Sequence, residues 1–389
     1  SPSRQPMKLY CIVLLYLFFG YGQFSVHSVR AAKPSAARQG NLTRSVPVIF
    51  HACPSWCFPR GHSEQYRFCY DRPFAPGDEP DYVWQLRTMK EAVPESALAV
   101  YCFVNEKRTV NYWLGVYEKY LDAATATGTR VLPSVHAISP EGAARRSDDL
   151  VRLTTALLNK YGTHPAWFQW NGRPMMLDYG SGGLRKVEDL SAALCRIRNE
   201  SGTPFFYVTE PLSDVTWAVK GEFTEDYIRG MLHETDGIYH FTQPLDPGLQ
   251  GYRNLGAEIR KAEDGRIYGA GIQPGYYSAR KNARNFVSSR GTQTLRKGFE
   301  ASLAGSPDFL HIKTWNDWVE ATSVEPSYAH THALLDIISC FASRLNGVSF
   351  PEDTQPRVVV SYRKNIFPGE TLDIKVLNLP VSPAFSPLR

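Results

Sequence analysis

Eight short apolar runs, separated by longer amphipathic stretches, constrain the fold of this chain more than any other feature. Runs of this length that are rich in branched and aromatic side chains are typical of buried β-strands. A strand followed by a helix and a further strand pairs in parallel, so the alternation predicts helical crossovers. The runs are Val46–Phe50, Ala97–Val104, Arg130–His136, Pro174–Tyr179, Pro204–Thr209, Gly237–Phe241, Ile267–Ile272 and Phe309–Thr314.

The stretches between these runs include three with a clear helical repeat, at 110–126, 148–160 and 330–345. In the first of them, Trp113, Tyr117 and Leu121 recur at the spacing of one helical face. Eight strand–helix units over about 270 residues fit a closed barrel, whose usual size is about 250 residues. The alternative is an open doubly wound sheet, but no run leads into the G-x-G-x-x-G or G-x-x-x-x-G-K motif that such sheets use. We therefore predict an α/β fold, a (β/α)8 TIM barrel over residues 46–350.

The character of the sequence changes after Pro351. Two short strand-like segments, 358–362 and 372–376, are separated by Pro368-Gly369. They predict a short β-rich appendage over residues 351–389, resembling part of a β-sandwich.

The N-terminal residues have the pattern of a secretory leader. Lys8 precedes an unbroken apolar run, 9–19, which is shorter than the ~20 residues that a membrane span needs. Val26-His27-Ser28 fits a cleavage site with small residues at its first and third positions. We predict a signal peptide or signal anchor over residues 1–28 and a flexible lead-in over 29–45. The mature protein is then expected to be secreted or lumenal, in the secretory pathway, with no stable membrane span.

Two sequons agree with this route, Asn41-Leu42-Thr43 and Asn199-Glu200-Ser201, so we expect a glycoprotein. Among the cysteines that follow the leader, a disulfide is most favoured within the group Cys53, Cys57 and Cys69. Cys102 lies in an apolar run and Cys340 on a helical face. We predict that both are buried free thiols.

The charge of the chain excludes one class of partner. The formal net charge is +5, and the first forty residues contain five basic side chains and no acidic one. The remainder is therefore close to neutral, without the basic stripe that follows a phosphate backbone. We expect no nucleic-acid partner, and we expect a monomer.

The most informative stretch for chemistry is 311–326, which follows the last predicted strand. It holds Trp315, Asn316 and Trp318 together with three carboxylates, those of Asp317, Glu320 and Glu325. In a (β/α)8 barrel the active site lies at the carboxyl ends of the strands. Hydrolysis of a glycosidic bond needs two carboxyl groups, and the tryptophan rings would give apolar walls beside them. The alternative is a tryptophan-rich loop that packs under the barrel and leaves its acids in solvent.

The same stretch resembles the signature of glycoside hydrolase families 71 and 99, which contain endo-α-1,3-glucanases and endo-α-mannosidases. The resemblance rests on Thr314-Trp315-Asn316-Asp317-Trp318-Val319-Glu320 and on Val324-Glu325-Pro326. Further segments occur in the order in which those families carry similar residues, so the resemblance covers about residues 46–330. These segments are His136 with Pro140, Tyr161–Pro165, Gly172-Arg173-Pro174, Asp236–Tyr239, Gly275-Tyr276 with Arg280, and Pro307-Asp308.

The resemblance implies a (β/α)8 barrel in which Asp317 and Glu320 are the catalytic pair. In the mannosidases the first acid is a glutamate that is thought to deprotonate the 2-hydroxyl of the sugar, while the second acts as acid and then as base. This chain has the shorter Asp317 at the first place, which is closer to the α-1,3-glucanase branch. The His-Ile-Glu-Pro-type motif of the mannosidases is also altered here, to His136-Ala137-Ile138-Ser139-Pro140.

Nine other residues are candidates for substrate contact. The histidine of the altered motif has the alternative of a packed loop residue, Glu210 that of an ion pair with a neighbouring arginine, and Arg280 that of holding the Asp317 loop. The pair His330 and His332 is too sparse for zinc, so we expect no metal and no cofactor. The nine candidates are His136, Asp178, Tyr179, Glu210, Tyr239, Arg280, Trp315, Asn316 and Trp318.

Three functional hypotheses follow from these patterns. The first is an endo-acting glycoside hydrolase that cleaves an α-linked polysaccharide or glycan, either α-1,3-glucan or α-mannoside, with Asp317 and Glu320. The second is a carbohydrate-binding protein on a catalytically retired hydrolase barrel. The third is a glycan-processing enzyme that keeps residues 1–28 and is retained in the secretory pathway.

Overall fold

The structure is a computed structural model that describes thirteen segments of the chain. The predicted leader run 9–19, the sequon at Asn41, Cys57, Cys69 and Arg280 lie outside them. The described segments are 24–29, 45–54, 81–105, 107–184, 186–211, 225–241, 256–257, 259–260, 265–277, 286–327, 330–348, 357–363 and 366–379.

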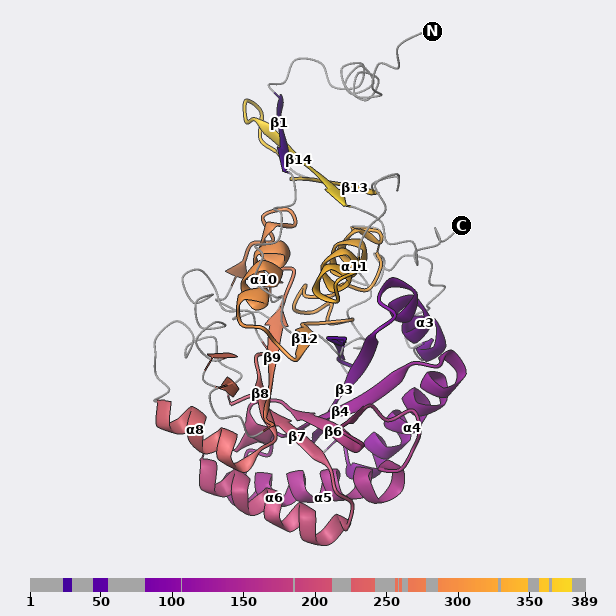
Figure 1. Ribbon diagram of the computed structural model, residues 1–389, viewed down its shortest axis with the longest axis vertical. Coiled ribbons are helices and arrows are strands. Elements are labelled where there is room, and N and C mark those ends of the chain that lie inside the picture. The colour runs from indigo at the N-terminus through magenta and orange to yellow at the C-terminus, as the bar shows by residue number, and fades with distance from the viewer. Residues whose placement is uncertain are drawn as a thin grey trace.

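Eight parallel strands close into a barrel, and each of them contains most of one predicted apolar run (Figure 1). The ladder runs β4-β3-β2-β12-β9-β8-β7-β6, and the pairing of β4 with β6 closes it. A two-residue strand, β5 (Gln169–Trp170), pairs antiparallel with β6 outside the barrel. The predicted (β/α)8 barrel is confirmed and the open sheet is excluded. The barrel strands are β2 (Val48–Ala52), β3 (Ser96–Val104), β4 (Arg130–Ala137), β6 (Arg173–Asp178), β7 (Phe206–Thr209), β8 (Gly237–Tyr239), β9 (Ile267–Ile272) and β12 (Phe309–Ile312).

The strands are buried on both faces, which explains why they read as continuous apolar runs rather than as alternating ones. Every residue of β2, β3 and β9 is buried. Side chains that point inward fill the barrel, and those that point outward pack under the helices. A sequence of alternating polar residues would have left one face of each strand in water.

Helices cover the outside of the barrel (Figure 1). The helix predicted at 110–126 is α4. Thr109 caps its start, because the side chain accepts the N–H of Tyr112, and Gly128, whose φ is 65°, caps its end. The helix predicted at 148–160 begins earlier, at Ala143. Its first turn is not recognisable in the sequence because Arg145 and Arg146 interrupt the apolar spacing. The helices are α3 (Tyr82–Ala92), α4 (Val110–Thr127), α5 (Ala143–Tyr161), the short 3₁₀ turn η1 (Ser181–Gly183), α6 (Val187–Ser201), α8 (Glu225–Glu234), α10 (Gln293–Ala304) and α11 (Ala333–Leu345).

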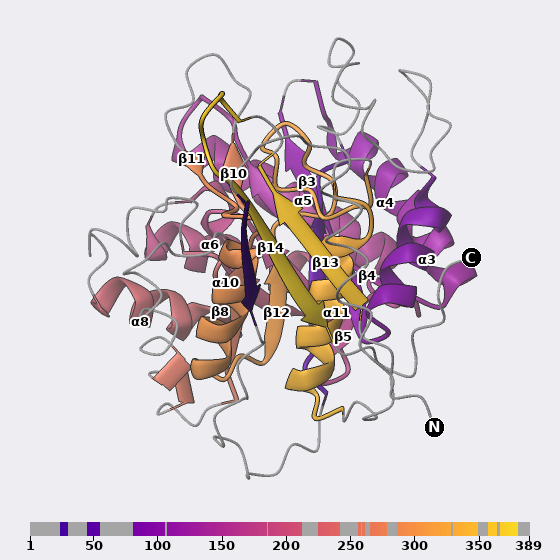
Figure 2. The same ribbon diagram turned by 90° about the horizontal axis from the view of Figure 1, so that it is seen from above.

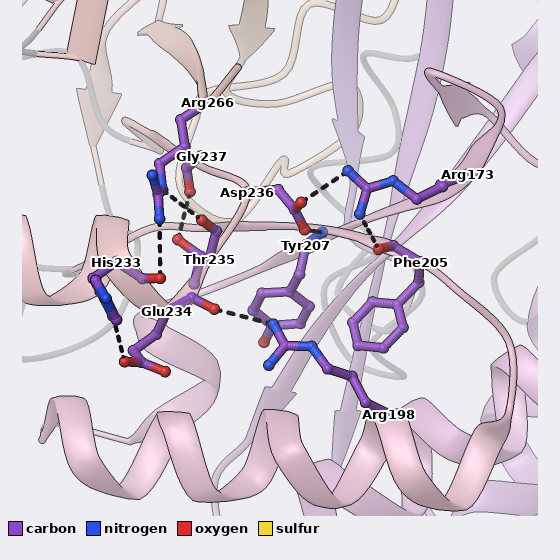
Figure 3. A network of polar contacts seen from close by, with 10 residues as sticks. All are labelled: Arg173, Arg198, Phe205, Tyr207, His233, Glu234, Thr235, Asp236, Gly237 and Arg266. Atoms are coloured by element: carbon purple, nitrogen blue, oxygen red, sulfur yellow. Dashed lines mark hydrogen bonds and ion pairs between the residues drawn. The ribbon is translucent and has the colours of Figure 1, made fainter. Parts of the chain in front are cut away.

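A polar network ties the amino ends of β6 to β9 together (Figure 3). The guanidinium of Arg173 pairs with Asp236 at 2.9 Å and donates to the carbonyl of Phe205 at 3.1 Å. The other oxygen of Asp236 accepts the N–H of Tyr207 at 2.8 Å. Arg266 donates to the carbonyl of Thr235 at 3.2 Å. Each of these charged groups bonds to the backbone of a neighbouring strand, so the network fixes the register of the barrel at this end.

The C-terminal appendage is a three-stranded sheet in the order β1-β14-β13. The predicted segments are β13 (Arg357–Tyr362) and β14 (Leu372–Leu379), which pair antiparallel. The third strand, β1 (Phe24–Val29), comes from the end of the predicted leader and pairs parallel with β14. The sheet lies against α10 and α11 (Figure 2). An ion pair from Arg357 to Asp336 on α11 holds it there.

Other sequence predictions can be located in the described part of the chain. Cys102 and Cys340 are buried and form no disulfide, as predicted. Asn199, in the second sequon, is exposed in the last turn of α6. None of the helices in the described segments combines the length and the hydropathy that a membrane-spanning helix needs.

Candidate active site

A pocket opens at the carboxyl end of the barrel, where the resemblance places the catalytic pair. The space between its walls and at its open mouth is about 290 Å³, and the walls come from the ends of β2, β3, β6 and β8 and from the loop after β12. Four segments that follow strands at this end, 55–80, 212–224, 242–255 and 278–285, lie outside the described residues. The described residues that line the pocket are His51, Cys53, Tyr101, Tyr179, Phe241, Asp317 and Glu320.

The loop after β12 is shaped by side chains that bond to its own backbone. The hydroxyl of Thr314 accepts the N–H of Asp317 at 3.0 Å, and the carboxylate of Asp317 accepts the N–H of Glu320 at 2.9 Å. A second hydroxyl, that of Thr322, closes the loop at 2.8 Å from the Thr314 hydroxyl. These turns present Asp317 and Glu320 to one pocket. They also use one oxygen of Asp317 in holding the loop.

Glu320 is held from two sides. Its Oε1 accepts a bond from the hydroxyl of Tyr276 at 3.3 Å, and its Oε2 lies 3.6 Å from Nζ of Lys313. The side chain of Glu320 is 15% exposed and that of Lys313 is 7% exposed. The ammonium group of Lys313 also lies 4.8 Å from the centre of the Tyr276 ring and 5.1 Å from that of Phe241. Two elements, the loop after β12 and the short strand β10 (Tyr276–Tyr277), thus fix one carboxylate.

Two histidines form the base of the pocket. Nδ1 of His51 lies 3.1 Å from Nε2 of His311, and both side chains are fully buried. Burial, followed by the charge of Lys313, lowers the pKa of His51 to about 3. Burial and the neighbouring His51 lower the pKa of His311 well below its usual value. Both rings are therefore neutral near pH 7 and act only as hydrogen-bonding groups.

Aromatic rings form the remaining walls. Tyr179 and Phe241 meet edge to face with their centroids 4.6 Å apart, and the ring of Tyr101 lies 5.6 Å from that of Tyr179. His136 stands behind this wall, with its Nδ1 2.7 Å from the Tyr101 hydroxyl. Burial lowers the pKa of His136 to about 4, so it too is neutral near pH 7. The predicted contact residue Tyr179 lies on the pocket, and His136 supports it.

Three predicted substrate contacts lie beneath the pocket rather than on it. Asp178 is fully buried and accepts the Thr209 hydroxyl at 2.7 Å and the N–H of Glu210 at 2.9 Å. Tyr239 is fully buried and donates to the carbonyl of Asp178 at 2.6 Å. Glu210 is 2% exposed and accepts the N–H of Gly180 at 3.0 Å. These side chains bond to neighbouring strand ends and hold the floor in place, and their contact with substrate stays a prediction.

Burial changes the protonation of these two floor acids. It raises the pKa of Asp178 to about 7, against the opposing effect of the Thr209 hydroxyl. It raises the pKa of Glu210 well above its usual value, with the N–H of Gly180 opposing. Both acids are close to the pocket, yet their shifts report an apolar environment and not exposure to a ligand.

The predicted contacts on the loop itself also bond to or pack on the protein, and their contact with substrate stays a prediction. Trp315 is fully buried and meets the ring of Phe50 edge to face at 5.6 Å, so it belongs to the core. The side-chain oxygen of Asn316 accepts the N–H of Cys53 at 2.9 Å and ties the loop to the end of β2. Trp318 is half-buried and donates to Glu325 at 3.3 Å. The tryptophans shape the loop, whereas the aromatic walls come from other strands.

Sequence reasoning missed most of the lining. His51, Tyr101 and Phe241 lie in or directly after predicted strands, and Lys313 and Tyr276 lie within segments that were noted without a role. The signal that could have found them is position: each is polar or aromatic and lies near the carboxyl end of a barrel strand, where active sites form. Arg280 lies outside the described residues, so its predicted role is unplaced.

The site has the groups for acid–base chemistry. It combines two carboxylates, a buried cation and neutral imidazoles. Among the described residues, no group of three histidine, cysteine or acidic side chains is placed to hold a metal ion.

Comparison with known proteins identifies solved structures of similar fold. The sequence matches no protein-family model, and none of the curated proteins matches it. A GH99 endo-α-mannosidase from Bacteroides thetaiotaomicron superposes with a TM-score of 0.54 at 16% identity, over 69% of this chain and 80% of that one. A second structure of the GH99 enzyme from this organism, in complex with bis-tris propane, gives 0.54 at 17% identity, over 69% of this chain and 84% of that one. The barrel of this chain is therefore similar in fold to that of a GH99 endo-α-mannosidase.

Proposed function

We propose that this protein is a glycoside hydrolase that cleaves internal bonds of an α-linked polysaccharide or glycan. The observation that carries the proposal is the placement of Asp317 and Glu320 on one short loop, both lining one pocket at the carboxyl end of the barrel. Glycoside hydrolysis in most families needs such a pair of carboxyl groups beside the scissile bond.

The surroundings of the pair support this chemistry. A tyrosine hydroxyl and a lysine hold Glu320 in place. A group that transfers protons must be held in this way beside the atom on which it acts. In the proposed mechanism Glu320 protonates the glycosidic oxygen and then accepts a proton from water, while Asp317 assists at the sugar.

A sugar ligand fits the walls. Tyr101, Tyr179 and Phe241 present ring surfaces, and the pyranose ring has C–H faces that pack against such surfaces. Polar groups at the base and apolar rings at the sides are the usual composition of a small-molecule site.

The polymer that we favour is α-1,3-glucan, with α-mannan as the second choice. Asp317 stands where the mannosidases have a glutamate, and the altered motif at His136 points in the same direction. The test is release of reducing ends from each polymer, with the anomer of the first product read by NMR. Cleavage of α-1,3-glucan but not α-mannan supports the choice, and the reverse result replaces it. If neither polymer is cleaved, the proposed activity is excluded.

A carbohydrate-binding protein on a retired barrel is the second candidate. One observation favours it: an oxygen of Asp317 already holds the N–H of Glu320, so the acid has a structural use. Binding of an α-linked oligosaccharide in calorimetry, without any release of reducing ends over days, would establish this reading.

We also propose that the protein enters the secretory pathway. The support is the leader pattern over 1–28 and the exposed Asn199 sequon on α6. Expression in a eukaryotic secretory host tests it: a mass shift that is removed by an endoglycosidase and by Asn199→Gln is expected. Sequencing of the mature N-terminus separates export from retention of residues 1–28.

A further inference from the structure

Lys313 occupies an unusual position for a lysine. Its side chain is 7% exposed at the end of β12, and lysines are almost never this buried unless they are paired. Burying an ammonium group costs several kcal/mol, which the site must offset. A lysine buried in this way must be stabilised by groups of the pocket, as a surface lysine need not be.

Three contacts around the pocket help to offset this cost, and one of them is with the loop after β12. Oε2 of Glu320 lies 3.6 Å from Nζ. The centres of the Tyr276 and Phe241 rings lie 4.8 and 5.1 Å from Nζ, within the range of a cation–π contact. Tyr276 makes a further link, because its hydroxyl donates to Oε1 of the same carboxylate. Lys313, Tyr276 and Glu320 thus form a closed set of mutual contacts.

Other titratable groups also surround Lys313, and Asp317 lines the same pocket as Glu320. His51 and His311 lie on the strands beside it, and the charge of Lys313 contributes to keeping both neutral. Burial raises the pKa of Glu210, after β7, and the charge of Lys313 opposes this rise. The carboxylate of Glu320 lies 3.6 Å from Nζ of Lys313, with both side chains largely buried.

We propose that Lys313 is a positioning residue that acts on the reaction through Glu320, fixing its carboxylate against the Tyr276 hydroxyl. This inference rests on the proposed function of the same site. Separating two opposite charges in a buried site costs several times what it costs in water, so the pair restricts the rotamers of Glu320.

The effect on the reaction follows from the proton transfer. To act as the acid, Glu320 first takes up a proton from solvent. When it gives this proton to the glycosidic oxygen, the C–O bond breaks and the carboxyl group becomes a carboxylate again, and it later takes the proton of the water that bonds to the anomeric carbon. The cation interacts more strongly with this charged form than with the neutral one. An interaction that strengthens along the reaction raises kcat and leaves KM nearly unchanged.

The test compares Lys313→Met, Lys313→Arg and the unaltered protein. Methionine fills a similar volume without charge, and arginine restores the charge. We expect Lys313→Met to lower kcat by about 10- to 100-fold with KM within about twofold, as loss of one preorganised charge does. We expect Lys313→Arg to recover at least part of kcat.

The matched control is Lys160→Met. Lys160 also pairs with a glutamate, Glu118, at 3.3 Å, but both side chains are about half exposed at 48% and 49%. This variant should retain the kcat of the unaltered protein. A Lys313→Met variant that also retains kcat overturns the proposal, and so does a loss that Lys313→Arg does not relieve at all.

A crystal structure of Lys313→Met gives a readout that does not depend on turnover. We expect the Glu320 side chain to leave the Tyr276 hydroxyl or to occupy more than one rotamer. A Glu320 that stays bonded to Tyr276 in one conformer overturns the positioning role. If the unaltered protein cleaves no α-linked glycan, the proposed function fails, while this structural comparison still decides whether Lys313 positions Glu320.

Discussion

The two ends of the barrel use the same kinds of charged side chain in different ways. At the amino ends of the strands, Arg173 and Asp236 pair at 2.9 Å with side chains 38% and 23% exposed (Figure 3). At the carboxyl ends, Lys313 and Glu320 lie 3.6 Å apart with side chains 7% and 15% exposed. The first pair is short and open to water, and the second is longer and buried.

Their other partners explain the difference. Arg173 and Asp236 also bond to the backbone of the adjacent strands, at Phe205 and Tyr207, so their bonding capacity serves the fold. The carboxylate of Glu320 is held by side chains, at the edge of a pocket that a ligand can enter. In the first pair the bonds to backbone hold strands in register, and in the second pair the contacts with side chains hold a carboxylate at the pocket.

The largest effect that should separate the two ends is the loss of turnover in Asp317→Asn. Asparagine keeps an oxygen that can accept the N–H of Glu320, so the loop should retain its shape while the charge is lost. We expect turnover to fall by about 10³-fold, as loss of a reacting carboxylate does. Steady-state kinetics on the cleaved polymer measures it. Activity within tenfold of the unaltered protein would assign Asp317 to the loop alone.

A second effect concerns the buried floor and its dependence on pH. Burial raises the pKa of Asp178 from 3.8 to about 7, so the folded chain keeps a proton that the unfolded chain releases. The stability gained from this proton is fully present below pH 3.8 and is lost as the pH rises to about 7, at about 1.4 kcal/mol per pH unit.

Asp178→Asn cannot titrate, so the difference in unfolding free energy between the two proteins should change across this window. The advantage of the unaltered protein should shrink by a few kcal/mol between about pH 5 and about pH 7. Urea unfolding at the two pH values measures it. A difference that stays constant would show that Asp178 has an ordinary environment.

At the amino end, Asp236→Asn should affect stability and spare chemistry. It weakens the pairing with Arg173 and leaves one good acceptor for two donors. Because the pair is partly exposed, we expect a loss of about 1–2 kcal/mol in unfolding free energy. Urea unfolding gives this value, and kcat should stay within about threefold. A large fall in kcat would remove the distinction between the two ends.

The smallest effect is expected for Tyr276→Phe. The ring remains beside Lys313, and only the hydroxyl at 3.3 Å from Glu320 is lost. A hydrogen bond to a charged group is worth about 1.5–3 kcal/mol, and this one is long, so we expect its loss to cost about 1 kcal/mol and kcat to fall by about three- to tenfold. Kinetics of this variant beside Lys313→Met would show which of the two contacts on Glu320 matters more. No change in kcat would leave the lysine as the contact that positions Glu320.

The fold was predictable from the sequence because burial on both faces makes each barrel strand a short continuous apolar run. All eight barrel strands and the helices at 110–126 and 330–345 follow from this pattern. The start of α5 did not, because Arg145 and Arg146 in its first turn interrupt the apolar spacing of the helix. The pair of Arg145 with Asp149 at 3.2 Å stabilises this turn.

The site was predictable only in part. The paired acids of the loop stand out as a local motif, and both reach the pocket. The tryptophans of the same motif do not line the pocket, because Trp315 turns into the core and Trp318 packs on the loop. The walls come from His51, Tyr101 and Phe241, which are far apart in sequence and meet only when the barrel closes. No local pattern records that meeting.

The most direct test of the account is one paired measurement on Glu320→Gln and Asp236→Asn, with turnover and unfolding free energy taken from the same preparations. The account predicts that Glu320→Gln loses about 10³-fold or more in turnover while it remains folded, as removal of an essential acid–base group requires. It predicts that Asp236→Asn keeps its turnover and loses stability. Cleavage that survives Glu320→Gln intact would contradict the assignment of the catalytic loop and the distinction between the two ends.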